Sequence, residues 1–92
     1  MYSSSTTITN PTGLHARPAT IFVEEAQKYT SNILIKNLNT SSNAKNAKSI
    51  ISLLSLALTS GTKIEISAEG NDEKDAVDNL INLVNSGLGE GQ

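Results

Sequence analysis

The chain has 92 residues, 37% hydrophobic and 17% charged, which is the size and composition of one folded domain. Its formal net charge is -2 and its basic residues are scattered, so the sequence lacks the basic patch typical of nucleic-acid binding. Without cysteine the chain forms no disulfide, thiolate metal site or cysteine nucleophile, and its one histidine cannot build a multi-histidine metal site. We expect a single domain, residues 1–92, with no metal and no cofactor.

No segment is suited to a membrane. The longest apolar-rich stretch, Ile50 to Leu58, is interrupted by two serines and is far shorter than the roughly 20 residues that span a bilayer. Met1 leads into a polar segment rather than the basic and apolar pattern of a signal peptide. We therefore expect a cytoplasmic protein with no membrane insertion.

The first third of the chain predicts a strand, a turn and a helix. Thr6–Asn10 is short and β-branched, which favours a strand, and residues 10–13 are of the types found in turns. Pro18 then precedes a helical pattern, in whose first turn its missing N–H is harmless. The apolar positions of this pattern are Ala19, Phe22, Val23 and Ala26, with Tyr29 one further turn along.

The middle of the chain predicts two strands and a short helix. Ile33–Lys36 favours a strand, and the polar run after it has room for a hairpin and an edge strand around Ser42–Asn46. Ser49 stands where a serine would cap a short helix with apolar residues on almost all sides. Such a helix must be buried or must dock on a partner.

The last third predicts a strand and a helix. Thr62–Ala68 alternates, as expected for a strand with one face toward the core. Asn71 and Asp72 are suited to capping a last helix, which ends before Gly87. The buried stripe of this helix is expected at Ala76, Val77, Leu80, Ile81 and Val84. The whole order favours one antiparallel or mixed sheet covered on one face by helices.

His15 is the main candidate for chemistry, because histidine changes protonation near neutral pH. It lies between a glycine-containing turn and a helix start, where the N–H groups from about Ala16 to Ala19 point toward any bound anion. Arg17 adds a planar charged group that binds phosphate oxygens. A phosphoryl group on the imidazole would be held there. The alternative is that His15 packs at the helix start and Arg17 is an ordinary solvated charge.

The string Asn-Pro-Thr-Gly-Leu-His-Ala-Arg-Pro-Ala-Thr at residues 10–20 closely resembles the active-site segment of the HPr family. These are the histidine-containing phosphocarriers of the bacterial phosphoenolpyruvate-dependent sugar phosphotransferase system. Lys48-Ser49-Ile50 and the leucine-rich segment after it resemble the regulatory-serine helix of HPr from Gram-positive-type bacteria. The resemblance covers nearly the whole chain and implies an α+β open-faced sandwich, in which three helices cover one face of a four-stranded antiparallel sheet.

The resemblance implies a phosphocarrier rather than a stand-alone enzyme. Enzyme I would phosphorylate His15 on Nδ1 with phosphoenolpyruvate as the source, and the A domains of enzymes II would accept the group for sugar uptake. Arg17 would assist the transfer, and the backbone of Ala16 and Arg17 would bind the phosphate. The protein is expected to be a monomer.

The resemblance also implies that Ser49 is a regulatory site. HPr kinase/phosphorylase would add and remove a phosphate there, which slows His15 phosphorylation and creates the form bound by the catabolite control protein. Phosphate at a helix N-terminus is electrostatically favourable, and it adds negative charge to the surface that meets other proteins. A second interpretation, compatible with the first, is that Ser49 is simply an N-cap.

The short helix is also a candidate docking surface, through Ile50, Ile51 and Leu54. The alternative is that these side chains all belong to the core. Ser52 replaces a glycine common in the family, Ile51 replaces a common methionine, and Asn37–Asn46 is longer than usual. These differences concern the regulatory contacts more than the histidine.

Two other functions remain open at the level of sequence. One is a mainly regulatory HPr-like protein that acts through phospho-Ser49; such proteins typically lack the histidine, and His15 argues against it. The other is a phosphotransfer paralogue of a nitrogen-related relay, against which the Ser49 helix favours carbon control.

Overall fold

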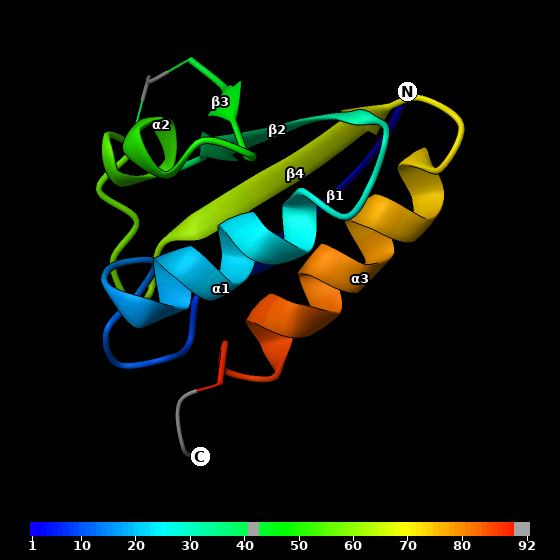
Figure 1. Ribbon diagram of the computed structural model, residues 1–92. Helices are drawn as coiled ribbons and strands as arrows, with labels where there is room; N and C mark the ends of the chain where they lie inside the picture. Colours follow the sequence, from blue (N-terminus) through cyan, green and yellow to red (C-terminus); the bar gives the residue numbers. More distant parts are fainter. Residues whose placement is uncertain (41–42, 90–92) are drawn as a thin grey trace.

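The computed structural model describes residues 1–40 and 43–89, and Figure 1 shows its arrangement. The elements in chain order are β1 (Tyr2–Thr7), α1 (Arg17–Ala26), β2 (Asn32–Asn37), β3 (Lys45–Asn46), α2 (Ile50–Leu54), β4 (Lys63–Glu69) and α3 (Glu73–Asn85). The strands form one antiparallel sheet in the order β1-β4-β2-β3. The helices lie against one side of this sheet (Figure 1), so the predicted open-faced α+β sandwich is confirmed.

One hydrophobic core lies between the sheet and the helices. Alternate residues of β2 and β4 face it, among them Ile35 and Ile66, which are fully buried. Phe22 of α1, Leu53 of α2 and Val77 of α3 complete the same cluster. The predicted stripe of α1 is confirmed at Ala19, Phe22, Val23 and Ala26, and that of α3 at Ala76, Val77, Leu80 and Val84, with Ile81 half-buried. Within the described ranges no helix is long and apolar enough to cross a membrane.

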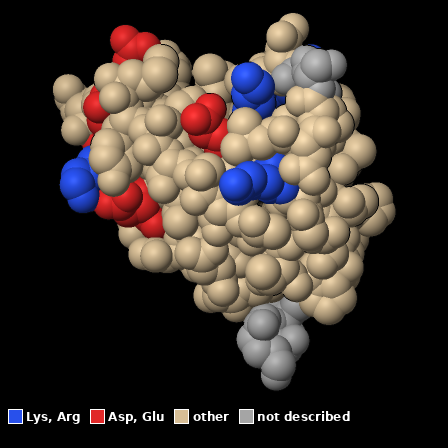
Figure 2. Space-filling view, turned by 180° about the vertical axis from the view of Figure 1, so that it is seen from behind, with Lys and Arg blue, Asp and Glu red and all other residues tan. Residues whose placement is uncertain are grey.

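The other side of the sheet is open to solvent. It presents the alternate residues that point away from the helices, including Ser3 and Ser5 of β1 and Ser67 of β4. Figure 2 shows the molecule from behind, where acidic groups and a basic group gather along the left-hand edge and the broad surface beyond them carries few charged groups.

The prediction for the first strand was wrong in its bounds. The strand covers Tyr2–Thr7 rather than Thr6–Asn10, because backbone pairing with β4 carries the Ser/Thr-rich segment into the sheet. At this edge the inward side chains are only half-buried, so apolar alternation is not required of them. The strand expected around Ser42–Asn46 is limited to Lys45–Asn46, and Ser42 lies outside the described residues.

Both long helices differ from expectation at one end. The first ends at Ala26, so Tyr29 lies beyond it, half-buried against the core. Asp72 occupies the N-cap position of α3 but makes no side-chain capping bond. Its carboxylate instead accepts hydrogen bonds from the Thr30 N–H at 2.9 Å, the Ser31 N–H at 3.0 Å and the Ser31 hydroxyl. These bonds, that of the Ser31 hydroxyl first, lower the pKa of Asp72 to about 2.

Candidate functional site

A tight turn lies between β1 and the residues that carry the expected chemistry. The Gly13 N–H donates to the Asn10 carbonyl at 3.1 Å, and the Asn10 side-chain amide donates back to the Gly13 carbonyl at 2.9 Å. Asn10 is buried, with only 1% of its surface exposed. The turn predicted at residues 10–13 is therefore closed by two hydrogen bonds.

The same turn is packed against the loop between α2 and β4. The Leu14 N–H donates to the Leu58 carbonyl at 2.8 Å. Gly13 has a φ of 73°, and a Cβ added there would lie 2.5 Å from the Leu58 carbonyl oxygen and 2.8 Å from the Cα of Thr59. Only glycine fits this close backbone approach without displacing the neighbouring loop.

The chain leaves the core directly after the turn. Leu14 is buried, whereas His15, Ala16 and Arg17 are all exposed. Ala16 is the N-cap of α1, with φ 57° and ψ -131°, a backbone conformation that residues with a side chain rarely adopt. This conformation turns the chain sharply between the anchored Leu14 and the helix. His15 therefore stands at the positive end of α1.

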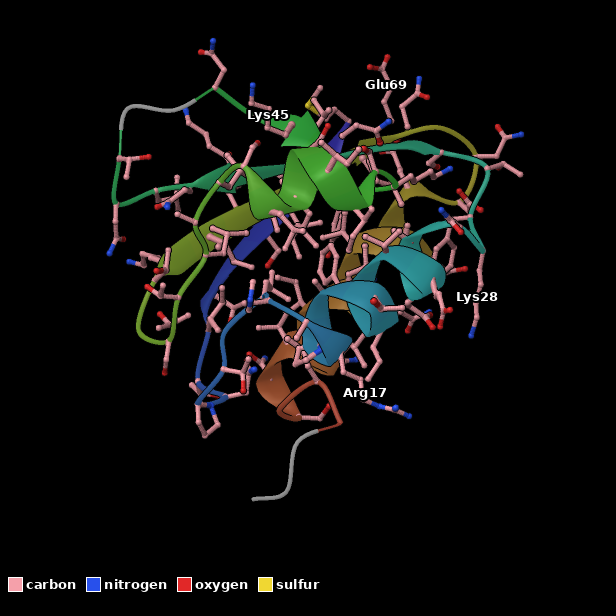
Figure 3. The ribbon with its side chains drawn as sticks, turned by 60° about the vertical axis from the view of Figure 1, so that its left-hand side comes forward. Arg17, Lys28, Lys45 and Glu69 are labelled. Atoms are coloured by element: carbon pink, nitrogen blue, oxygen red, sulfur yellow. The ribbon has the colours of Figure 1, made fainter. Side chains whose placement is uncertain are left out.

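Arg17 is the first residue of α1, and Pro18 follows it in the first turn, as predicted. In Figure 3 its side chain extends from the start of the helix into solvent, whereas Lys28 lies beyond the other end. Within residues 1–40 and 43–89 the guanidinium has no carboxylate within ion-pair distance. Its donors are therefore available to an incoming anion.

A hollow of about 240 Å³ lies beside His15. Its lining comes from the turn, the end of α2 and the loop after α2: Thr12, Leu14, His15, Leu54, Ala57, Leu58 and Thr59. The hollow thus joins two regions that the sequence singled out separately, the histidine and the apolar side of the short helix. A larger hollow of about 460 Å³ lies elsewhere, over β2, β4 and the segment from Asn46 to Lys48, and includes none of the expected site residues.

Ser49 has the local role expected of a cap. It is the N-cap residue of α2, and its hydroxyl oxygen accepts a hydrogen bond from the Ser52 N–H at 3.3 Å. The preceding carbonyl, of Lys48, accepts a bond from the side-chain amide of Gln27, which follows α1. The start of α2 is therefore joined to the far end of the helix that begins after His15.

The apolar side chains of α2 divide between core and surface. Leu53 is fully buried, whereas Ile51 is 78% exposed, Leu54 42% and Ile50 37%. The interpretation that the whole helix belongs to the core is therefore wrong. All three proposed docking residues lie on the surface, and Leu54 also borders the hollow beside His15.

Two parts of this site were not expected from the sequence. The first is the loop after α2, where Leu58 holds the turn and Ala57 adopts a φ of 52°. The second is the side chain of Asn10, which appeared only as a turn residue. Its position before Pro11 in a turn is a sequence signal, but contact between residues 14 and 58 has no local signature.

The chain matches the protein family described as "PTS HPr component phosphorylation site" over residues 2–86. It is 44% identical over 84 residues to the phosphocarrier protein HPr of Haemophilus influenzae, covering 91% of this chain and 95% of that protein. It is also 48% identical over 73 residues to the HPr-like protein Crh of Halalkalibacterium halodurans, covering 79% and 83%. The chain spans only 17% of another relative, the multiphosphoryl transfer protein of Haemophilus influenzae, with 42% identity.

A solved structure agrees over the full length. That of HPr-C-His from Thermoanaerobacter tengcongensis has a TM-score of 0.92 and 40% identity, with 100% of both chains covered. Because the family match covers residues 2–86 and relatives above 40% identity cover most of the chain, the family does not depend on the histidine segment alone. The chain belongs to the HPr family of phosphocarrier proteins.

Proposed function

We propose that His15 accepts a phosphoryl group from phospho-enzyme I and passes it to the A domains of enzymes II. The observation that carries this proposal is the exposure of His15 at the start of α1, on a turn that is otherwise fixed by hydrogen bonds. An exposed imidazole is open to two different partners in succession, as a carrier requires. Sugar uptake is the process that this relay would serve.

The transfer needs no other nucleophile. The lone pair of Nδ1 in the neutral imidazole attacks phosphorus, the bond from phosphorus to the donor atom breaks, and its electron pair leaves with the donor. The ring proton stays on Nε2. The reverse sequence, with an enzyme II A domain as acceptor, regenerates the neutral imidazole.

Arg17 and the backbone after His15 supply positive charge around the phosphoryl group. N–H groups at the start of a helix have no intrahelical partner, so those of Ala16 and Arg17 are suited to phosphate oxygens. The Arg17 guanidinium adds a pair of donors that matches two oxygens. Both contributions help most when they bind the transferring group better than the resting phosphohistidine.

Labelling with phosphoenolpyruvate tests the proposal. The chain is incubated with enzyme I and labelled phosphoenolpyruvate, and acid lability of the product is measured. We expect acid-labile label in the wild-type chain and none in His15→Ala, because no other residue of the sequence is a histidine. Since His15 is exposed, the substitution should change the free energy of unfolding by less than about 0.5 kcal/mol.

Two results would contradict the proposal. Label that persists in a folded His15→Ala chain would place the phosphate on another residue. A wild-type chain that takes no label from active enzyme I would leave a regulatory role as the better explanation. The 48% identity to an HPr-like protein Crh is the observation that favours this second candidate.

Regulation through Ser49 is the second part of the proposal. HPr kinase/phosphorylase would phosphorylate its hydroxyl, and the catabolite control protein would bind the product. The N-cap position supports this, because a phosphate there meets the positive end of a helix and lies beside Ile50 and Ile51 on the surface. These exposed side chains, with Leu54, would form the docking surface shared by the partners of a monomeric, cytoplasmic carrier.

The variant Ser49→Asp tests this regulation. Aspartate also caps helices, so the fold should be retained, while the added charge should lower the rate of His15 phosphorylation by enzyme I. Ser3→Asp is the matched control, since it adds the same charge to an exposed position on the open side of the sheet. Equal rates for the two variants would contradict a specific role for Ser49.

A further inference from the structure

We infer that Asn10 is a positioning residue for the reaction of His15, acting through the peptide group between Gly13 and Leu14. This inference rests on the proposed function of His15. Asn10 is a buried polar side chain five residues before the histidine, and the proposed transfer assigns it no part in the bonds that form or break.

The peptide group between Gly13 and Leu14 is held from both sides. Its carbonyl accepts a hydrogen bond from the Asn10 side-chain amide at 2.9 Å. Its N–H donates to the Leu58 carbonyl at 2.8 Å. Two bonds of opposite direction fix the rotation of this peptide plane between the turn and the loop after α2.

Fixing this peptide sets the direction of the chain at the next residue. The Leu14 side chain is buried, with 2% of its surface exposed, so its Cα is held by packing as well as by the peptide. His15 is exposed, so packing holds its side chain less firmly than that of Leu14. The orientation of the imidazole therefore depends on the backbone that Asn10 and Leu58 hold.

The chemistry of asparagine suits this role. Its short side chain presents an N–H donor within reach of a carbonyl three residues later, and it is neutral, so burial does not carry the cost of an unpaired charge. Alanine at this position would leave the Gly13 carbonyl without that donor. Misplacement of a reacting group by about 1 Å can lower a rate by about 100-fold.

The experiment compares two buried asparagines. Asn37 is the matched control, since it is 3% exposed and its side-chain amide donates to the Leu56 carbonyl at 3.0 Å, outside the turn. The rate of phosphorylation by enzyme I and phosphoenolpyruvate is measured against protein concentration for wild type, Asn10→Ala and Asn37→Ala. Thermal unfolding is recorded for each chain.

We expect Asn10→Ala to lower kcat about 10-fold with KM changed less than about 2-fold, because Ile51 and Leu54 on the proposed docking surface are untouched. Asn37→Ala should keep the wild-type kcat despite a lower Tm. Equal losses of kcat in the two variants would overturn the inference, because the effect would then follow general destabilisation. So would a wild-type kcat in Asn10→Ala.

Two further measurements keep the test decisive. If Asn10→Ala is unfolded at the assay temperature, Asn10→Ser is used; its hydroxyl donor should restore part of the rate, and a fully wild-type kcat would overturn the inference. If the wild-type chain takes no label, the proposed function fails, and with it the role of Asn10 in the reaction. Hydrogen exchange of the Leu14 amide tests the structural step separately: faster exchange in the Asn10 variant but not in Asn37→Ala shows that Asn10 holds this peptide, and unchanged exchange overturns the inference even where the label is found.

Discussion

The two ends of α1 use their polar residues in opposite ways. At the start, His15 and Arg17 are exposed, and their positions come from backbone contacts of the turn before them. Around the far end, polar side chains bind one another and nearby backbone N–H groups. The Tyr29 hydroxyl donates to Glu25 at 2.9 Å and accepts from the Asn79 amide at 2.5 Å, while Asp72 accepts three hydrogen bonds from residues 30–31.

The difference shows how a small domain separates stability from transfer. A side chain that must bind a phosphoryl group and then let it go works best when no internal partner competes for it. The Arg17 guanidinium has no such carboxylate partner among the described residues. Around the far end, the polar side chains of Tyr29, Asn79 and Asp72 are instead occupied by bonds within the fold. Substitutions of the exposed side chains before and at the start of α1 should therefore affect transfer, whereas substitutions of the bonded side chains around its far end should affect stability.

The largest effect is expected at Gly13, where the turn before His15 lies closest to the loop after α2. Gly13→Ala should lower the free energy of unfolding by about 2 to 4 kcal/mol, because it combines an unfavourable positive φ with a clash against Leu58. Denaturant unfolding measures this, and the labelling rate of the folded fraction should fall as well.

Gly61→Ala is the control for that clash. Gly61 has a φ of 91°, but nothing in the described part of the chain lies within 4 Å of a Cβ added there. The free energy of unfolding should therefore fall by about 1 to 2 kcal/mol, the effect of the unfavourable positive φ alone. Similar losses at Gly13 and Gly61 would show that the contact with Leu58 contributes nothing.

Arg17 should affect transfer and leave stability unchanged. Arg17→Ala removes the proposed charged hydrogen bond to the transferring group, for which about 1.5 to 3 kcal/mol is expected, so kcat should fall about 10-fold to 100-fold. Arg17→Lys keeps the charge without the planar pair of donors, so its kcat should lie between those of the wild type and Arg17→Ala. The free energy of unfolding should change by less than about 0.5 kcal/mol in both Arg17 variants. A wild-type kcat in Arg17→Ala would remove Arg17 from the proposed mechanism.

Much of this arrangement follows from local sequence. The helical spacing from Ala19 and the alternation of β4 each predicted an element and its buried face, and the cap at Ser49 predicted the start of α2 but not which of its apolar residues are buried. The bounds of the first strand could not be predicted in this way, because its residues join the sheet through backbone pairing rather than through apolar side chains. His15 and Arg17 stood out through the family resemblance, whereas the support from Leu58 arises only when residues 44 positions apart in the chain meet.

The most selective test of this comparison is the substitution of Asp72, which bonds to residues 30–31 beyond the far end of α1. Its folded pKa of about 2 lies below the ordinary value of 3.8, so its bonds to residues 30–31 stabilise the fold above pH 4 and lose that effect as pH falls toward 2. Asp72→Asn should therefore have a lower Tm than wild type at pH 7, and the difference should shrink between pH 4 and pH 2. Thermal unfolding across this range measures it.

The activity of the same variant separates the two ends. Because Asp72 lies beyond the far end of α1, the folded variant should be phosphorylated at the wild-type rate at pH 7. Asp75→Asn is the control for the loss of a carboxylate at a helix start. Asp75 is exposed in the first turn of α3, and its substitution removes an equal charge without removing the bonds that Asp72 makes to residues 30–31. A Tm difference for Asp72→Asn that is as large at pH 2 as at pH 7 would show that the stabilisation comes from packing rather than from the ionised carboxylate. A slower His15 reaction in the folded variant would show instead that the two ends of α1 are coupled.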